Sequence, residues 1–181
     1  MILTKQQRYV LDILDKLGCA RKDQLGTLLH AKFYPPEKPL PAGLMDSLLR
    51  QFAFCNIRLN TEGDAVFLPG KKPESDRLAA VDVMLELSMA TPTEFWAEKG
   101  PFLLHFSVAG DRVNLFAVLH AARCSEIDVR APPALNPSER VVILLDGECR
   151  PPALALPNPQ FYAIRQENGT HRFFAKENHK T

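Results

Sequence analysis

The sequence predicts an α+β protein built from two parts, and the order of its apolar patterns carries this prediction. Residues 1–72 contain three stretches with helical spacing, followed by two short alternating runs around a turn. Residues 73–181 contain one more helical stretch and then apolar strands separated by proline-rich loops. Three helices followed by a hairpin is the order of a winged helix–turn–helix. We therefore expect such a domain over residues 1–72. Residues 73–181 are expected to form a small α/β domain with a mainly antiparallel sheet.

The first helix is expected over residues 4–17. Thr4 is a suitable N-cap, because its hydroxyl can accept a hydrogen bond from a free N–H group of the first turn. Apolar residues from Tyr9 to Leu17 recur at helical spacing, and Gly18 ends the pattern.

Two further helices and a hairpin complete the first part. The second helix is expected within residues 19–33, and the proline-rich stretch 34–41 after it cannot be helical throughout. The third helix is expected over residues 42–54. Alternating runs within residues 55–68, with Gly63 at the bend, predict an antiparallel hairpin in the position of the wing.

After a linker over residues 69–75, a fourth helix is expected over residues 76–89. Its apolar pattern places Met89 on the inner side and places Asp82 and Glu86 on the opposite, solvent side.

The remaining elements are strands. A hairpin is expected within residues 102–120, with its turn at Gly110. The apolar run 140–147 is typical of a strand that is covered on both faces. Asn168-Gly169 lies between two more strands and predicts a type I′ hairpin.

The composition indicates an ordinary globular protein. The chain has 181 residues, 46% of them apolar and 24% charged, and no apolar run of the roughly 18 residues that span a membrane. Its N-terminus becomes polar after three residues, so we expect no signal peptide. The four cysteines are far apart, which argues for reduced thiols in a cytoplasmic protein without disulfides or a zinc site. They are Cys19, Cys55, Cys124 and Cys149.

Charge is distributed unevenly between the two parts. The formal net charge of the whole chain is only +1, so nothing global indicates nucleic acid. Residues 1–72, however, hold eleven Lys and Arg against seven Asp and Glu, whereas the rest of the chain holds eleven against fourteen. A basic N-terminal part joined to an acidic remainder is the pattern of a nucleic-acid-facing module carried by another domain.

The first part of the chain resembles a known family. The stretches LTKQQRYVLDILDKLGCARKDQLGTLL (3–29) and LMDSLLRQFAFCNIRLNTEGDAVFLPGK (44–71) look like those of the replication-relaxation proteins of plasmids and mobile elements. Those proteins combine a winged helix with a second α/β domain, a relative of restriction-endonuclease-like folds that has often lost its catalytic residues. The resemblance covers about the first 90 residues at the level of pattern.

The resemblance implies binding to duplex DNA, with the third helix in the major groove and the wing along the backbone. One departure matters: the third helix carries a single cation, Arg50, and Asp46 one turn earlier would repel phosphate. The residues implied to face the groove are Asp46, Ser47, Arg50 and Gln51. Those implied to meet phosphates are Arg58, Lys71 and Lys72, with Lys5, Arg21 and Lys22 adding charge nearby.

Catalytic residues were sought in the second part and are not expected. A restriction-like nuclease needs an Asp and a nearby acidic-x-Lys to hold a divalent metal. Asp111 stands in the second hairpin, but no acidic-x-Lys follows it. Glu126, Asp128 and Arg130 alternate and would converge on one face of a strand, although such a stretch is more often a solvated edge. We expect no catalytic site, no metal and no cofactor.

For the histidines and the paired aromatic residues, a structural role is a simpler explanation than a functional one. His105 lies in an apolar stretch and is expected to be buried and hydrogen-bonded. His120 and Cys124 are four residues apart, but no second pair of metal ligands accompanies them. Phe95 and Trp96 would anchor a partner or, more often, cover the core.

The leading hypothesis is a non-enzymatic DNA-binding protein that regulates transcription or replication in a bacterial mobile element. Its winged helix would contact double-stranded DNA, and its second domain would bind a partner or form a homodimer. Two alternatives stay open: a protein–protein adaptor whose winged helix does not bind DNA, and a metal-dependent nuclease. The first two differ in whether acidic residues interrupt the cations of the wing and third helix. The acidic residues concerned are Asp46, Glu62 and Asp64.

Overall fold

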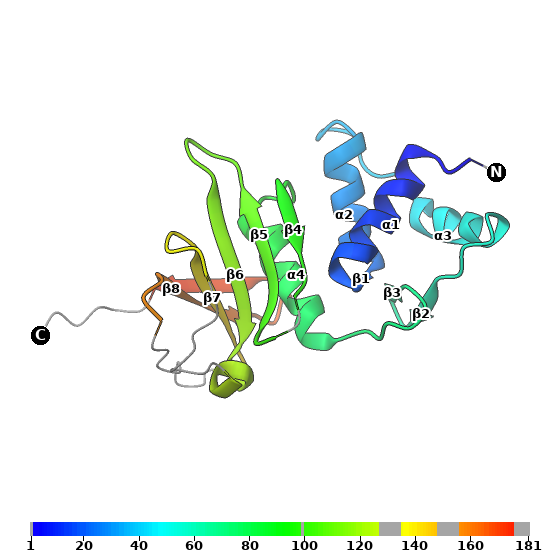
Figure 1. The fold of residues 1–181 in the computed structure, drawn as a ribbon. Helices are drawn as coiled ribbons and strands as arrows, with labels where there is room; N and C mark the ends of the chain where they lie inside the picture. Colours follow the sequence, from blue (N-terminus) through cyan, green and yellow to red (C-terminus); the bar gives the residue numbers. More distant parts are fainter. Residues whose placement is uncertain (1, 99, 127–134, 148–155, 176–181) are drawn as a thin grey trace, which may run out of the picture. The chain divides into compact units, whose positions relative to one another are not determined.

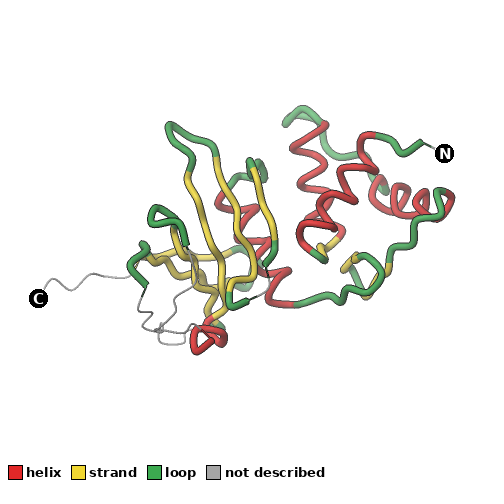
Figure 2. Tube along the Cα trace, viewed as in Figure 1, coloured by secondary structure: helices red, strands yellow, loops and turns green. Residues whose placement is uncertain are grey.

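A computed structural model gives the fold (Figure 1). It describes residues 2–98, 100–126, 135–147 and 156–175, with only the backbone of residues 125 and 126. The chain forms two compact units, unit 1 over residues 1–91 and unit 2 over residues 92–181. Unit 1 is helical with a small antiparallel sheet, and unit 2 is built on a larger mixed sheet (Figure 2). The α+β class and the N-terminal winged helix are as the sequence predicts.

Unit 1 has the complete order of a winged helix, followed by one additional helix. The three-stranded sheet has the order β1-β3-β2, with both outer strands antiparallel to β3. The elements are α1 (Lys5–Leu17), β1 (Cys19–Arg21), α2 (Lys22–Phe33), α3 (Leu44–Phe54), β2 (Asn60–Glu62), β3 (Ala65–Phe67) and α4 (Ser75–Leu87).

The boundaries of α1 are set by residues that the sequence identifies. The Thr4 hydroxyl accepts a hydrogen bond from the Gln7 N–H group at 3.2 Å, and the Gln7 side chain accepts one from the Thr4 N–H group at 2.8 Å. This reciprocal pair is a capping box. At the other end Gly18 has φ 80°, a value that residues with a Cβ rarely adopt, and its N–H group bonds to the Leu14 carbonyl. The predicted first helix is confirmed.

Strand β1 is the element of unit 1 that the sequence does not predict. The second helix was expected within residues 19–33, but α2 begins only at Lys22. The three residues before it pair with β3, from Cys19 opposite Phe67 to Arg21 opposite Ala65. The wing hairpin is correspondingly short, with Gly63 at φ 60° in its turn.

Helix α4 differs from its prediction at Asp82 and at its end. Asp82 was expected on the solvent side, yet its residue is only 9% exposed. Met89, expected on the inner side, lies beyond the end of α4 at Leu87 and is 85% exposed. α4 packs on α2 and β1. For this reason the chain divides after residue 91, beyond α4, and not after residue 72 as the composition of the linker predicts.

Unit 2 is a six-stranded sheet with the order β4-β5-β6-β7-β8-β9. Three of its five strand pairs are antiparallel, and β7 is parallel to both of its neighbours. Its elements are β4 (Glu94–Trp96), β5 (Phe102–Val108), β6 (Asn114–His120), a 3₁₀ helix (Ala121–Glu126), β7 (Arg140–Leu145), β8 (Gln160–Arg165) and β9 (His171–Ala175).

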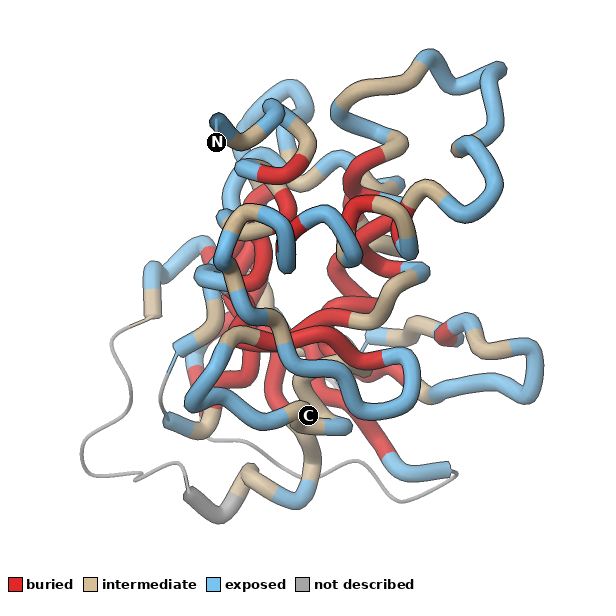
Figure 3. The backbone as a smooth tube through the Cα atoms, turned by 90° about the vertical axis from the view of Figure 1, so that its right-hand side faces the viewer, coloured by how far each residue is buried: buried red, intermediate tan, exposed pale blue. Residues whose placement is uncertain are grey.

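The central position of β7 is confirmed. Val141 to Leu145 are all buried, as expected of a strand covered on both faces. Alternate residues of neighbouring strands share one face and form a core cluster there. Its buried members are Phe102, Ala117, Leu119, Val141, Ile143, Leu145, Leu156 and Tyr162. Figure 3 colours the chain by burial and shows long buried stretches joined by loops of exposed residues.

The hairpin between β8 and β9 forms with a different turn from the predicted type I′. The Gly169 N–H group bonds to the Gln166 carbonyl at 3.0 Å, and the Gln166 N–H group bonds to the Thr170 carbonyl at 2.8 Å. These bonds enclose three residues, 167–169, with left-handed backbone at Gly169 (φ 86°). Such a loop is a type I turn closed by a glycine bulge, the next commonest hairpin connection.

His105 is buried and hydrogen-bonded, as the sequence predicts. Its Nδ1 donates to Glu139 Oε1 at 2.8 Å, and Glu139 is itself buried. Its Nε2 lies 3.2 Å from Glu98 Oε2 without hydrogen-bond geometry. The Trp96 ring stacks on the imidazole with the ring centroids 5.4 Å apart. This cluster joins β4 and β5 to the segment that precedes β7.

We expect His105→Gln to lower the free energy of unfolding by about 3 kcal/mol, because it leaves the buried Glu139 carboxylate without its partner. His120→Gln is the matched control. His120 bonds to Asp146, whose side chain is 78% exposed, so its loss should cost about 1 kcal/mol or less. Urea denaturation followed by tryptophan fluorescence measures the free energy of unfolding of both variants. Equal decreases would contradict the larger contribution expected of the buried His105–Glu139 pair.

None of the helices in the described ranges is long and apolar enough to cross a membrane. Within the described ranges Cys19, Cys55 and Cys124 form no disulfide, and burial raises the pKa of Cys19 and of Cys124. Cys149 lies outside the described residues.

Candidate nucleic-acid interface

Helices α2 and α3 form the helix–turn–helix pair of unit 1. α3 buries Met45, Leu48 and Phe52, which recur at helical spacing and fix the inner face of the helix. The opposite face carries Arg50 and Phe54, both exposed. In helix–turn–helix proteins the second helix of the pair enters the major groove, so this outer face is the one to examine.

Asp46 does not present an unpaired charge. Its Oδ1 accepts a hydrogen bond from Lys22 Nζ at 2.8 Å, across from the first turn of α3 to the first turn of α2. The hydrogen bond and the charge of Lys22 hold the pKa of Asp46 below its usual range. The pair therefore neutralises Asp46, which was expected to repel phosphate. It also engages Lys22, which was expected to attract phosphate.

Ser47 and Gln51 are held by hydrogen bonds within unit 1. Gln51 Nε2 donates to Ser47 Oγ at 3.3 Å, and Gln51 Oε1 accepts from Gln7 Nε2 at 3.2 Å. Gln7 is only 3% exposed and also closes the capping box of α1. Both functional ends of the Gln51 amide are thus engaged, and base contacts by this side chain would have to replace these bonds.

Arg50 is the cation that α3 extends toward solvent. Its Nε donates to the Asp46 carbonyl at 3.3 Å, which draws the stem of the side chain along the helix. Among the described residues it makes no ion pair within 4 Å. Of the groove-facing candidates, Arg50 is therefore the one whose charge is available to an external ligand.

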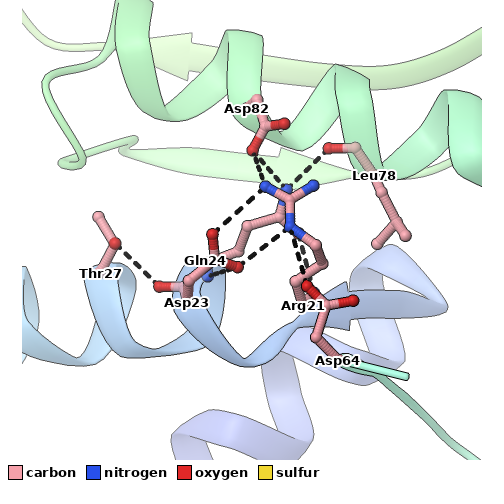
Figure 4. Close-up of polar contacts among 7 residues, drawn as sticks. All are labelled: Arg21, Asp23, Gln24, Thr27, Asp64, Leu78 and Asp82. Carbon is pink, nitrogen blue, oxygen red and sulfur yellow. Dashed lines mark hydrogen bonds and ion pairs between the residues drawn. The ribbon is translucent and has the colours of Figure 1, made fainter. Parts of the chain in front are cut away.

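Arg21 was also expected near DNA, but its guanidinium forms ion pairs with carboxylates of unit 1 (Figure 4). Its Nη2 donates to Asp82 Oδ1 at 2.5 Å, and its Nε lies 3.1 Å from Asp23 Oδ1 and 3.6 Å from Asp64 Oδ2. Burial alone would lower the pKa of Arg21, but the hydrogen bonds to Asp82 and Asp23 outweigh it and raise the pKa. A phosphate would therefore have to displace these carboxylates to reach this guanidinium.

Gln24 completes this network. Its side-chain amide donates to Asp82 Oδ1 and to the Leu78 carbonyl, both at 2.7 Å, and its Oε1 accepts the Arg21 N–H group at 2.9 Å. The network ties the start of α2 to α4, and through Asp64 it reaches the turn of the wing. The sequence did not predict the role of Asp82, because its helical pattern placed this residue on the solvent side of α4. Its apolar neighbours on both sides in the chain are the signal that could have found it.

The remaining cations flank the wing and are exposed. Arg58 precedes β2, and Lys71 and Lys72 follow β3 in the segment that leads to α4. Within the described ranges they make no ion pair. Glu62, at the end of β2, is exposed and likewise has no ion-pair partner there.

An open groove of about 750 Å³ lies beside α3 within unit 1. α2, the proline-rich loop and the first turn of α3 line it, together with residues 89–91. Met89 and Ala90 at its edge have φ 48° and 61°, backbone values that are costly for residues with a side chain.

Several expectations for unit 2 are settled only in part. Asp111 lies exposed in the turn between β5 and β6. The side chain of Glu126 and all of Asp128 and Arg130 lie outside the described residues. Over the described ranges, no three His, Cys, Asp or Glu side chains gather in a way that would hold a metal ion. Phe95 is buried, as expected of a residue that covers the core, and Trp96 is 43% exposed.

Comparison of the chain with protein-family models, curated proteins and solved structures finds no significant match.

We expect Asp82→Ala to lower the free energy of unfolding of unit 1 by about 3 kcal/mol, because it leaves the half-buried Arg21 without its main partner and Gln24 without an acceptor. Asp12→Ala is the matched control, since it breaks the exposed Lys16–Asp12 pair on α1 and should cost about 0.5 kcal/mol or less. Urea denaturation followed by circular dichroism measures both. If Asp82→Ala lowers the free energy of unfolding as little as the control does, the network does not stabilise unit 1 as we infer.

Proposed function

We propose that the protein binds duplex DNA through the winged helix of unit 1, without catalysis. The observation that carries this proposal is the way charges pair inside the unit. Asp46 is paired with Lys22, and Arg21 is shared by the carboxylates of Asp82, Asp23 and Asp64, so the fold already engages both of these cations. On α3 and beside the wing, four exposed cations make no ion pair with a residue that the structure describes. They are Arg50, Arg58, Lys71 and Lys72.

Two parts that a winged helix uses to contact DNA, the outer face of the third helix and the wing, carry these cations. Arg50 lies on the outer face of α3, and the other three flank the hairpin of the wing. An α-helix fits the major groove, which is about 12 Å wide, while the wing approaches the neighbouring backbone. Each phosphate neutralised releases counterions, so four contacts would give a slope of log K against log salt of about −3 to −4.

The wider role follows from the resemblance of the first 90 residues. Within this proposal the protein is a cytoplasmic regulator of replication or transcription in a mobile element of the replication-relaxation type. Unit 2 would bind a partner or a second copy of the chain. Residues 92–181 hold ten Lys and Arg against ten Asp and Glu, so the charge of unit 2 does not favour a DNA contact of its own.

A protein-docking function of unit 1 is the second candidate. The observation that favours it is the open groove beside α3, with Met89 85% exposed at its edge. Methionine is common at adaptable binding surfaces. In this reading the groove would be occupied and the cations of the wing would be ordinary solvated charges.

Fluorescence anisotropy of a labelled duplex, titrated with protein at rising salt, tests the first proposal. Affinity should fall roughly 100-fold between 50 and 200 mM salt and should be lost in the variant Arg58→Glu/Lys71→Glu/Lys72→Glu. A variant with the same change of charge on unit 2, Arg112→Glu/Arg165→Glu/Arg172→Glu, should bind nearly as the wild type does. If the folded protein does not bind the duplex at low salt, the result would contradict DNA binding and favour the second candidate, docking of a protein on unit 1.

The Lys22–Asp46 pair makes a second prediction. Asp46→Asn should free the ammonium group of Lys22 for phosphate, raise the affinity for duplex DNA about three- to tenfold and steepen the salt slope by about one. Asp12→Asn removes the carboxylate that Lys16 contacts on α1 and serves as the control. An affinity that is unchanged by Asp46→Asn, or raised equally by both, would contradict placement of α2 and α3 at the DNA.

A further inference from the structure

The outer face of α3 carries one feature that phosphate binding does not use. Phe54 is 76% exposed, although it is among the largest apolar side chains of the protein. It follows Arg50 by four residues, so the two side chains lie on the same face one turn apart. The neighbouring polar side chains are engaged: Asp46 with Lys22, and Gln51 with Ser47 and Gln7. On the outer face of α3, Arg50 and Phe54 are therefore the side chains available to contact a ligand.

The backbone at Phe54 is fixed by the end of the helix. The Cys55 and Ile57 N–H groups both bond to the Phe52 carbonyl, at 2.9 and 3.0 Å. Between them Asn56 adopts the left-handed conformation, with φ 58°, that commonly closes a helix. The exposed ring thus projects from an ordered last turn, and a contact through it costs little ordering of the main chain.

An arginine and an apolar ring side by side match the chemistry of the major groove. Guanine presents two acceptors, O6 and N7, that arginine reads, and thymine presents a methyl group that accepts apolar contact. Four residues advance a helix by about 6 Å, close to two base-pair steps of about 3.4 Å. The exposed cations that flank the wing, Arg58, Lys71 and Lys72, complement the charge of DNA and not that of an apolar protein surface.

We propose that Phe54 packs on the 5-methyl group of a thymine in the major groove, within two base pairs of a guanine read by Arg50. The ligand of unit 1 is then duplex DNA that contains thymine beside guanine. This inference rests on the proposed DNA binding and adds to it a specificity-determining residue, Phe54, that phosphate contact alone would not need.

Replacement of thymine by uracil tests this proposal, because it removes the methyl group and leaves the phosphates and base pairing in place. The probes are two labelled duplexes of about 24 base pairs, one with alternating guanine and thymine on one strand and one with uracil at every thymine. We expect the wild type to bind the thymine duplex about fourfold more tightly, the effect of burying one methyl group. Phe54→Ala should bind both duplexes equally, at the affinity that the wild type has for the uracil duplex.

Two further variants make the result specific. Phe54→Leu keeps an apolar side chain and should retain most of the preference for thymine. Arg50→Ala should weaken binding to both duplexes and keep their ratio. Circular dichroism checks that each variant is folded, which the exposure of both side chains leads us to expect.

Equal affinity of the wild type for both duplexes would overturn the role of Phe54 and leave DNA binding intact. A preference for thymine that persists in Phe54→Ala would also overturn it, because the preference would then come from DNA shape. Absence of binding to either duplex at low salt would overturn the inference together with the proposed function.

Discussion

The ion pair between Arg21 and Asp82 is the contact on which the organisation of unit 1 depends. Arg21 ends β1 and immediately precedes α2, so its side chain lies where the wing sheet and the helix–turn–helix meet. Asp82 comes from the middle of α4, and its Oδ1 accepts hydrogen bonds from both Arg21 and Gln24. A carboxylate buried to this degree is stable only with such partners, because desolvation of an unpaired charge costs several kcal/mol.

This pair has consequences for function as well as for stability. It holds α4 on the winged helix and withdraws Arg21 from the group of cations available to DNA. Asp64 in the turn of the wing lies 3.6 Å from the same guanidinium, which links the hairpin to the start of α2. Arg50 on α3 and the cations that flank the hairpin stay exposed. If unit 1 binds DNA as proposed, the surface that meets DNA is set by which charges the fold has already paired.

The sequence predicts elements whose signals are local and misses those that depend on distant partners. α1 could be placed because Thr4 and Gly18 mark its ends, and β7 because a continuous apolar run is typical of a central strand. β1 could not be predicted, since its three residues form a strand only by pairing with β3, far along the chain. Likewise, Asp46 and Asp82 were given solvent positions, and only the tertiary structure brings Lys22 and Arg21 to them. The candidate cations were identifiable from the sequence, but not which of them stay unpaired.

The central claim is that the outer face of α3 and the flanks of the wing form the surface that meets DNA. A titration of ¹⁵N-labelled protein with a short duplex, followed by backbone amide chemical shifts, tests it residue by residue. The account predicts that the largest changes fall on Arg50 to Phe54, on Arg58 and on Lys71 and Lys72, with little change in unit 2. Changes concentrated on residues 89–91 and the proline-rich loop, or on the strands of unit 2, would contradict it.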